Sequence, residues 1–223
     1  MNGNRALFIT GTDTGVGKTY VASGIASAFR RRGFDVGVMK PVETGCPVRA
    51  GRLYPRDALR LRTASGSRDK LDLVNPYRFM KPLAPSVAAE FEGKEIDIEH
   101  ILAAYRELLS RHDRLIIESA GGIMVPITGS FTFLDLAEMI SAPVFVVARP
   151  GLGTINHTML TLAALRQRSI EVAGIIINFA SSGKRGAAEK TNPAVIQSLC
   201  GNTKLEVLAH ESKDFSRILE MLA

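Results

Sequence analysis

The stretch that decides the fold of this 223-residue chain reads Ile9-Thr10-Gly11-Thr12-Asp13-Thr14-Gly15-Val16-Gly17-Lys18-Thr19. A short apolar run, Ala6 to Ile9, precedes it, and a segment with helical apolar spacing, Val21 to Phe29, follows it. Together they predict a buried strand, a glycine-rich turn and the start of a helix. At such a junction, backbone N–H groups and the helix N-terminus bind phosphate oxygens. The stretch therefore predicts a phosphate-binding loop for a nucleoside triphosphate.

The end of this loop, Gly17-Lys18-Thr19, supplies the reactive side chains. Lys18 is expected to reach the β- and γ-phosphates, and the Thr19 hydroxyl is expected to ligate Mg²⁺. The spacing departs from the usual motif, because five residues rather than four separate Gly11 from Gly17, and Thr12 takes the first-glycine position. The residues predicted to surround the nucleotide phosphates are Thr14, Gly15, Val16, Gly17, Lys18, Thr19 and Tyr20.

The composition is that of a globular protein, since 46% of the residues are hydrophobic and a sizeable core can form. The length suits one α/β domain over residues 1–223. No apolar run reaches the roughly 18 residues that a membrane span needs. The chain runs straight into the phosphate loop, which leaves no room for a signal peptide. Cys46 and Cys200 fit no zinc or redox spacing, so we expect free thiols in a cytoplasmic protein.

The net charge of +6 could indicate a nucleic-acid partner, but the basic residues are scattered. The densest run, Arg30-Arg31-Arg32, closes the first predicted helix, where cations complement the carbonyl end of the helix dipole. A basic balance also suits a polyphosphate and a carboxylate as ligands. We therefore expect neither a nucleic-acid nor a membrane partner.

Strands and helices alternate along the chain. Strands are expected at residues 6–9, 35–39, 115–117, 143–148, 172–177 and 205–208. Helices are expected at residues 21–29, 56–63, 85–91, 98–109, 155–167, 193–199 and 215–222. The helix at 193–199 would have Asn192 as its N-cap, and residues 43–55 and 181–186 are expected to form loops, the second of them mobile. This order predicts one doubly wound, mainly parallel sheet with helices on both faces.

Polar residues directly follow five of the predicted strands: Thr10, Lys40, Glu118, Arg149 and Asn178. Because ligands bind beyond the carboxyl ends of parallel strands, we expect these residues to share one rim. Glu118, at the tip of an apolar strand, is expected to ligate Mg²⁺. Lys40 alone could equally be an exposed lysine. Beside a triphosphate, however, it could stabilise negative charge that develops on a transferring group.

Asp57 and the segment Gly151–His157 each allow two interpretations. An Asp near a helix start is more often a cap or dipole partner than a metal ligand. The free N–H groups of the helix that follows Gly153 could bind an anion such as a substrate carboxylate, but a plain loop is equally compatible. His157 is more typical of a core or interface residue, and the histidines and cysteines form no catalytic constellation.

Taken together, these motifs resemble the dethiobiotin synthetase family, which has the P-loop NTPase fold. The resemblance covers roughly residues 5–180, and the opening loop with its extra residue and Lys40-Pro41-Val42 are its most specific parts. In the family's order, the matching motifs are Gly11 to Thr19, Lys40-Pro-Val-Glu-Thr-Gly45, Asp57-Ala-Leu59, Asn75-Pro-Tyr77, Ala84-Pro85, Glu118-Ser-Ala-Gly-Gly122, Val125-Pro126 and Gly153-Thr-Ile-Asn-His157.

The resemblance implies an ATP-dependent ligase of biotin biosynthesis that acts on 7,8-diaminononanoate (7,8-diaminopelargonate). CO₂ forms a carbamate on one amine, ATP phosphorylates the carbamate, and the second amine closes the ureido ring, giving dethiobiotin, ADP and phosphate. Lys18 and Lys40 are implied as catalytic residues. Thr19, Asp57 and Glu118 are implied as ligands of an Mg²⁺ ion held with the nucleotide.

The remaining roles follow from the same resemblance. Thr44 stands where the family has a small hydroxyl residue that contacts the carbamate, and Asn178 matches the family's adenine-reading Asn. Residues 153–156 match the segment that, in a homodimer, receives the substrate carboxylate of the neighbouring subunit. The substrate-binding residues so implied are Thr12, Lys40, Thr44, Gly121, Gly153, Thr154, Ile155 and Asn156.

Two features depart from the family pattern. Ser119 replaces the glycine that usually follows the metal-binding glutamate. After Asn178, the family's Gly-x-Ile-Pro segment, which helps to frame the base, is missing, and residues 205–210 stand in its place. We therefore hypothesise weaker discrimination for adenine, with phosphate contacts carrying most of the nucleotide affinity.

Three other classes of nucleotide-dependent protein fit less well. Partition and septum-site ATPases carry the pattern Lys-Gly-Gly-x-Gly-Lys, and Asp13 occupies its first lysine position here. The chain also shows no basic amphipathic membrane helix at its C-terminal end. Corrinoid amidoligases need a glutaminase domain, for which 223 residues leave no room. A nitrogenase-reductase-like role needs cluster cysteines, and Cys46 and Cys200 do not supply that pattern.

Overall fold

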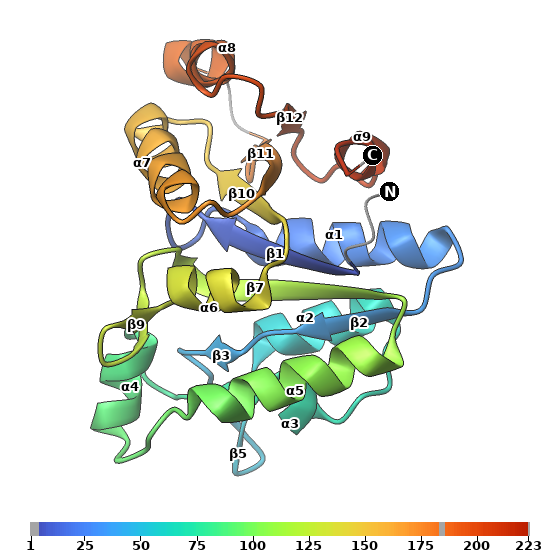
Figure 1. Cartoon of the computed structure of the whole chain (residues 1–223), viewed down its shortest axis with the longest axis vertical. Helices are drawn as coiled ribbons and strands as arrows, with labels where there is room; N and C mark the ends of the chain where they lie inside the picture. The colour runs from blue at the N-terminus through green and yellow to red at the C-terminus, as the bar shows by residue number, and fades with distance from the viewer. Residues whose placement is uncertain (1–4, 183–185, 223) are drawn as a thin grey trace.

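The computed structural model describes residues 5–182 and 186–222, and a six-stranded sheet forms its centre (Figure 1). The strands lie in the order β12-β11-β10-β1-β7-β2. All the pairings between these neighbours are parallel. The bounds are β1 Ala6–Gly11, β2 Val36–Met39, β7 Arg114–Gly122, β10 Val144–Ala148, β11 Val172–Asn178 and β12 Leu205–Leu208. The predicted parallel sheet is confirmed.

Helices cover both faces of this sheet, because its strands bury side chains on both sides (Figure 1). Leu7 and Ile9 of β1 pack with helices α1, α2 and α9. Ala6 and Phe8 belong to the other core, which includes residues of α4, α5, α6, α7 and α8. The helices are α1 Lys18–Arg31, α2 Arg56–Ser65, α3 Leu71–Val74, α4 Pro85–Phe91, α5 Ile98–Arg111, α6 Phe133–Ile140, α7 Thr154–Gln167, α8 Ala187–Leu199 and α9 Ser216–Glu220.

Short strand pairs lie outside the main sheet. The two-residue strand β3, Val42–Glu43, pairs with β6, Tyr77–Arg78. The other pairs are β4 Val48–Arg49 with β5 Arg52–Leu53, and β8 Pro126–Thr128 with β9 Phe131–Thr132. The prediction of a continuous loop at residues 43–55 is therefore wrong. Pro41 ends β2, but the chain resumes an extended pairing directly after it.

Strand β7 is longer than the sequence predicted, because it passes Glu118 and continues to Gly122. Glu118 pairs with Ile9, and after a shift of register Gly122 pairs with Gly11. A Cβ at Gly122 would lie 3.4 Å from the carbonyl oxygen of Gly11, which is an ordinary van der Waals contact, so β7 runs closely beside the phosphate loop here. Glu118 is thus held within a strand rather than at its tip.

The predicted start of the helix after β11 is wrong. Helix α8 begins at Ala187, so Asn192 and Pro193 lie inside it. The buried amide of Asn192 donates to the carbonyls of Pro150 and Gly151, so it tethers the loop after β10 instead of capping a helix. Pro193 removes one helical hydrogen bond, and these tertiary contacts hold the helix across it. The loop predicted at 181–186 falls partly on residues 183–185, which are outside the described residues.

Two helices, α3 and α6, were not predicted from the sequence. Helix α6 begins at a capping box, in which the Thr132 hydroxyl accepts from the Asp135 N–H and the Asp135 carboxylate accepts from the Thr132 N–H. Within the described part of the chain, no helix is both long and apolar enough to span a bilayer.

Candidate active site

The predicted phosphate loop joins the end of β1 to the start of α1. Gly15 and Gly17 adopt positive φ angles of 75° and 96°, which favour glycine. A Cβ at Gly17 would lie 2.0 Å from Nδ2 of Asn178, so no larger residue fits there. The same Asn178 amide donates to the Val16 carbonyl at 2.9 Å. Asn178, at the end of β11, therefore holds the loop in shape.

Lys18, the first residue of α1, has a buried ammonium group within this loop. Its Nζ donates to the carbonyl oxygen of Asp13 at 2.9 Å. Burial, followed by repulsion from Lys40, lowers the pKa of Lys18 to about 8. An anion such as a phosphate would counter both effects, because it favours the charged amine.

A second lysine, Lys40, lies beside two carboxylates at the same edge of the sheet. Its Nζ donates to Oε1 of Glu118 at 2.6 Å and to the Ser119 carbonyl at 3.0 Å. It also lies 3.6 Å from Oδ2 of Asp57. Burial alone would lower the pKa of Lys40, but the neighbouring Glu118 and Asp57 outweigh it and raise this pKa. Lys40 is therefore a fixed, buried cation.

The carboxylate of Glu118 is fully buried between this lysine and the phosphate loop. The Thr19 hydroxyl donates to Oε1 of Glu118 at 2.8 Å. The second oxygen, Oε2, is buried and has no hydrogen-bond partner among the residues that the structure describes. A buried carboxylate oxygen without a partner is costly, so this atom is suited to receive a cation.

These oxygens fit a metal that is shared with a nucleotide. Among residues 5–182 and 186–222, no group of three His, Cys, Asp or Glu residues could hold a metal by itself. Thr19, Asp57 and Glu118 offer one hydroxyl and two carboxylates, which are the oxygen donors that Mg²⁺ takes when phosphate oxygens and water complete its shell. The donor set therefore fits Mg²⁺ bound together with phosphates.

The lysines and carboxylates line one cavity of about 760 Å³ at the carboxyl ends of the strands. Most of the predicted site residues border this cavity, namely Thr14, Gly15, Gly17, Lys18, Thr19, Tyr20, Lys40, Thr44, Asp57, Glu118 and Gly121. A neighbouring cavity of about 290 Å³ is bordered by Val16, Asn178 and Arg149. Its lining also includes Gly15, so the two cavities meet at the phosphate loop.

Comparison with known proteins places this geometry in a family. A family model described as an AAA domain matches residues 5–211. The ATP-dependent dethiobiotin synthetase BioD of Thermodesulfovibrio yellowstonii is 46% identical over 210 residues, which cover 91% of this chain and 88% of that protein. The chain belongs to the dethiobiotin synthetase family.

Other relatives agree with this assignment, and a solved structure shares the fold. The ATP-dependent dethiobiotin synthetase BioD of Bacillus velezensis is 43% identical over 88% of this chain and 82% of its own. That of Methanococcus vannielii is 39% identical over 94% and 95%, respectively. The hydrogenase maturation factor HypB of Archaeoglobus fulgidus matches 99% of this chain and 89% of its own with a TM-score of 0.57. At 16% identity, that last likeness concerns the fold alone.

Ser119, which departs from the family pattern, is not among the residues that border the main cavity. Its buried hydroxyl lies 3.2 Å from the Thr10 hydroxyl and 3.3 Å from the Gly121 carbonyl. The extra oxygen therefore has partners of its own, and the Ser119 carbonyl still accepts from Lys40. The structure accommodates this substitution without adding a group to the cavity.

The segment after β12 lies against the start of α1, although it lacks the family's Gly-x-Ile-Pro pattern. The Tyr20 hydroxyl donates to the Ser212 carbonyl, and the Tyr20 ring lies 6.0 Å from the ring of Phe215. Burial and the nearby Glu211 raise the pKa of Tyr20. The C-terminal segment therefore still borders the phosphate loop.

Five of the predicted substrate-binding residues line neither of these two cavities. Thr12 is bound through its N–H to the Val147 carbonyl at the end of β10. Gly153, Thr154, Ile155 and Asn156 form the start of α7, and the buried Thr154 hydroxyl has no hydrogen-bond partner within residues 5–182 and 186–222. The exposed Leu152 directly precedes them, with 87% of its surface accessible. Residues 153–156 thus border neither cavity of their own chain, whereas Pro150 and Gly151 just before them line the smaller one.

Several residues of the main cavity were not singled out from the sequence. Glu43 and Arg60 border it, and so does the turn at residues 82–85 that leads into α4. Glu43 lies within the Lys40–Gly45 motif, but its partners are in α2, so no local pattern indicates its role. Arg60 follows Asp57 by almost one helical turn, which is the one signal that could have placed it at the same edge.

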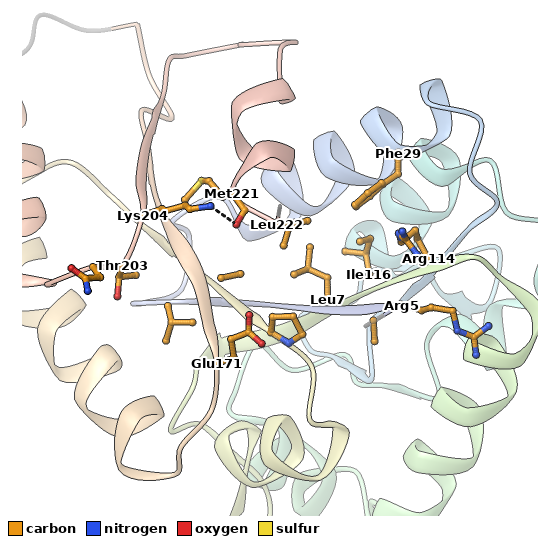
Figure 2. A pocket seen from close by; sticks show the side chains of 15 residues that line it. Arg5, Leu7, Phe29, Arg114, Ile116, Glu171, Thr203, Lys204, Met221 and Leu222 are labelled. Carbon is orange, nitrogen blue, oxygen red and sulfur yellow. Dashed lines mark hydrogen bonds between the residues drawn. The ribbon is translucent and has the colours of Figure 1, made fainter. Parts of the chain in front are cut away.

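A further cavity of about 300 Å³ lies at the opposite end of the sheet (Figure 2). Leu7, Ile116 and Leu222 contribute apolar groups to it, and the Lys204 ammonium donates to the Met221 carbonyl at its side. It contains none of the predicted site residues. The predicted site residues that border a cavity therefore border the two cavities at the phosphate loop.

Proposed function

We propose that this chain closes the ureido ring of dethiobiotin from 7,8-diaminononanoate and CO₂ with the hydrolysis of ATP to ADP and phosphate, in biotin biosynthesis. Its relatives are named for the synthesis of dethiobiotin. The observation that carries the proposal is the pairing of a phosphate-loop lysine with a second buried lysine, Lys40, across one cavity. A second fixed cation is what a negatively charged phosphoryl acceptor needs.

The reaction has three balanced steps. One amine of the substrate attacks CO₂ and loses a proton, which forms a carbamate. A carbamate oxygen then takes the γ-phosphoryl group, and ADP leaves. The second amine attacks the carbamate carbon and loses a proton, the phosphate leaves with the former carbamate oxygen, and the ring closes. The second step brings two anions together, the carbamate and the γ-phosphate, so electrostatic stabilisation is the main task of the protein.

Lys18 and Lys40 are the residues that we assign to this task. Lys18 stands in the phosphate loop, where it would contact the β- and γ-phosphates. Lys40 is held within the same cavity by Glu118 and the Ser119 carbonyl, so its charge is already in place before the phosphoryl group moves. Such preorganised charge lowers the barrier because it needs no rearrangement during the reaction.

Thr19, Asp57 and Glu118 would hold Mg²⁺ with the nucleotide phosphates. The ion would neutralise charge on the β- and γ-phosphate oxygens. The unpartnered Oε2 of Glu118 supports this assignment. The phosphate contacts are assigned to Thr14, Gly15, Val16, Gly17, Lys18, Thr19 and Tyr20, and the base contact to Asn178.

We assign the substrate site to two subunits, each of which contacts one end of the diamine. Thr12, Lys40, Thr44 and Gly121 would contact the carbamate end of the diamine. The helix start at residues 153–156 would bind the substrate carboxylate of the neighbouring subunit, because its N–H groups favour an anion. The exposed Leu152 beside it supports a homodimer that covers this loop. We propose a cytoplasmic, single-domain enzyme, and the two buried free thiols support that location.

Purified protein mixed with 7,8-diaminononanoate, bicarbonate and MgATP tests the proposal. Mass spectrometry should detect dethiobiotin, with one ADP formed for each product molecule. Omission of any one component should abolish the product. If the protein is folded and binds MgATP but forms no dethiobiotin, the assignment is refuted. If GTP or CTP but not ATP supported dethiobiotin formation, the proposed reaction would stand and only the assigned phosphoryl donor would change.

A further inference from the structure

We infer that Glu43 is a positioning residue, which places Asp57 for the nucleotide-bound metal by binding the first backbone N–H groups of α2. The inference rests on the proposed function only in taking Asp57 as a metal ligand. Nothing in the local sequence around Glu43 indicates this role, because its partners lie 14 and 15 residues further along the chain.

Glu43 is a buried carboxylate on the short strand β3, with 5% of its surface accessible. Its Oε1 accepts from the Asp57 N–H at 3.0 Å, and its Oε2 accepts from the Ala58 N–H at 2.9 Å. Both N–H groups belong to the first turn of α2, where a helix offers them no acceptor of its own. The negative charge also lies at the positive end of the helix dipole.

The start of α2 has no side-chain cap of its own. Its N-cap residue is Pro55, which makes no side-chain hydrogen bond to the helix. Helices are usually capped by Ser, Thr, Asp or Asn directly before their first residue. Here a carboxylate from another strand replaces that cap. The first turn of α2 is therefore fixed to β3 rather than only to the loop that precedes it.

This attachment decides where Asp57 can lie. The Asp57 side chain is 44% exposed, so burial does not fix its position. Its Oδ2 lies 3.6 Å from Nζ of Lys40, and Lys40 stands just before β3. One side chain, Glu43, thus links the backbone of Asp57 to the segment that carries Lys40. Both oxygens of Glu43 already accept backbone N–H groups, so its carboxylate is turned to the helix.

A purely structural cap and a positioning residue differ in what their loss changes. Loss of a structural cap lowers the stability of the protein and lowers its affinity for every ligand to the same extent. Loss of a positioning residue weakens only the binding that depends on Asp57, which is the metal-dependent part of nucleotide affinity. Partners of metal-binding carboxylates typically contribute about 10- to 100-fold to metal affinity.

Titration calorimetry with ATP, in Mg²⁺ and separately in EDTA, tests the inference on Glu43→Ala and Glu43→Gln. Glu43→Ala should weaken ATP binding in Mg²⁺ by about tenfold or more. ATP affinity in EDTA should stay within about twofold of that of the unaltered protein, because no metal is present for Asp57 to bind. Glu43→Gln should lie between the two, since its single carbonyl oxygen can accept one N–H. Asp97→Ala is the matched control, because it removes the carboxylate that caps α5 away from the cavity.

A double variant separates the two roles. In the Asp57→Asn background, Glu43→Ala should cause little further loss of Mg²⁺-dependent affinity, since the two residues act through one group. Losses that multiply, or equal losses in Mg²⁺ and in EDTA, would overturn the inference. If Glu43→Ala does not fold, Glu43→Gln gives the same comparison. These measurements record ATP binding and do not depend on product formation. Failure to form dethiobiotin would therefore count against the proposed function, but the result for Glu43 could still be interpreted.

Discussion

Replacement of Lys40 by Met should destabilise the protein strongly, because it leaves a buried carboxylate without its cation. Lys40 lies 2.6 Å from Oε1 of Glu118, which is fully buried. Oε2 of Glu118 has no hydrogen-bond partner in the described part of the chain, so the Thr19 hydroxyl would be the one donor left there for this carboxylate. Removal of one partner of a buried ion pair costs about 3–5 kcal/mol.

We expect the lower end of that range, since the Thr19 hydroxyl still donates to Glu118. About 3 kcal/mol corresponds to a fall of roughly 6–12 °C in Tm for a domain of this size. Met keeps most of the side-chain volume, so little of this loss would come from a cavity. Differential scanning calorimetry of Lys40→Met without nucleotide measures it.

The double variant Lys40→Met, Glu118→Gln is the matched control. Loss of both charges leaves no buried carboxylate, so its Tm should recover most of the difference. At temperatures well below the Tm, Lys40→Met should still bind nucleotide but should lose turnover by about 10²-fold or more. A Tm within about 2 °C of the unaltered protein would refute the ion-pair reasoning. Unchanged turnover would remove Lys40 from the mechanism.

Four further outcomes are expected. Glu118→Gln should weaken Mg²⁺-ATP binding by about 10-fold or more and leave ATP binding in EDTA much less affected, whereas equal losses in calorimetry would argue against metal ligation. Because the free protein's Lys18 has a pKa lowered to about 8 and bound phosphate favours its charged form, nucleotide affinity should fall by up to about tenfold per pH unit above 8, and a flat profile from pH 7 to 9.5 would contradict this. With the base-framing segment altered, GTP and CTP should support turnover within about tenfold of ATP, and a strong ATP preference in a product assay would refute the weaker discrimination. Analytical ultracentrifugation should show a dimer, and a strictly monomeric active enzyme would refute the shared substrate site.

The fold was largely predictable, because its strands are buried on both faces and read as continuous apolar runs. The rim of the site was predictable for the same reason. Lys40 follows such a strand, Asn178 ends one, and Glu118 ends the apolar run of β7 although the strand itself continues to Gly122. Parallel strands bring their carboxyl ends together. The prediction of a helix start at Asn192-Pro193 was wrong, because this pair is typical of a helix start but here lies inside α8. The side-chain amide of Asn192 donates to carbonyl groups of a loop more than 40 residues earlier, and no local sequence pattern indicates this contact.

The role of Asp57 was the least predictable part of the site. From its position alone, Asp57 is more typical of a dipole partner at a helix start, and only the family resemblance predicted a metal ligand. In the structure, Glu43 accepts the N–H groups of Asp57 and Ala58 in the first turn of α2. The Asp57 carboxylate is thereby free to lie beside Lys40. The contact that decides this joins β3 to α2 and has no counterpart in the spacing of the sequence.

The path of one oxygen atom tests the central claim most directly, namely that the phosphoryl group moves onto a carbamate between Lys18 and Lys40. The protein, 7,8-diaminononanoate and MgATP would be mixed rapidly with ¹⁸O-labelled CO₂ and stopped before the label exchanges with water. Mass spectrometry should find one ¹⁸O in the released phosphate and one in the ureido carbonyl of dethiobiotin. Unlabelled phosphate formed along with labelled dethiobiotin would contradict the account, because ATP would then be cleaved without phosphorylating the carbamate.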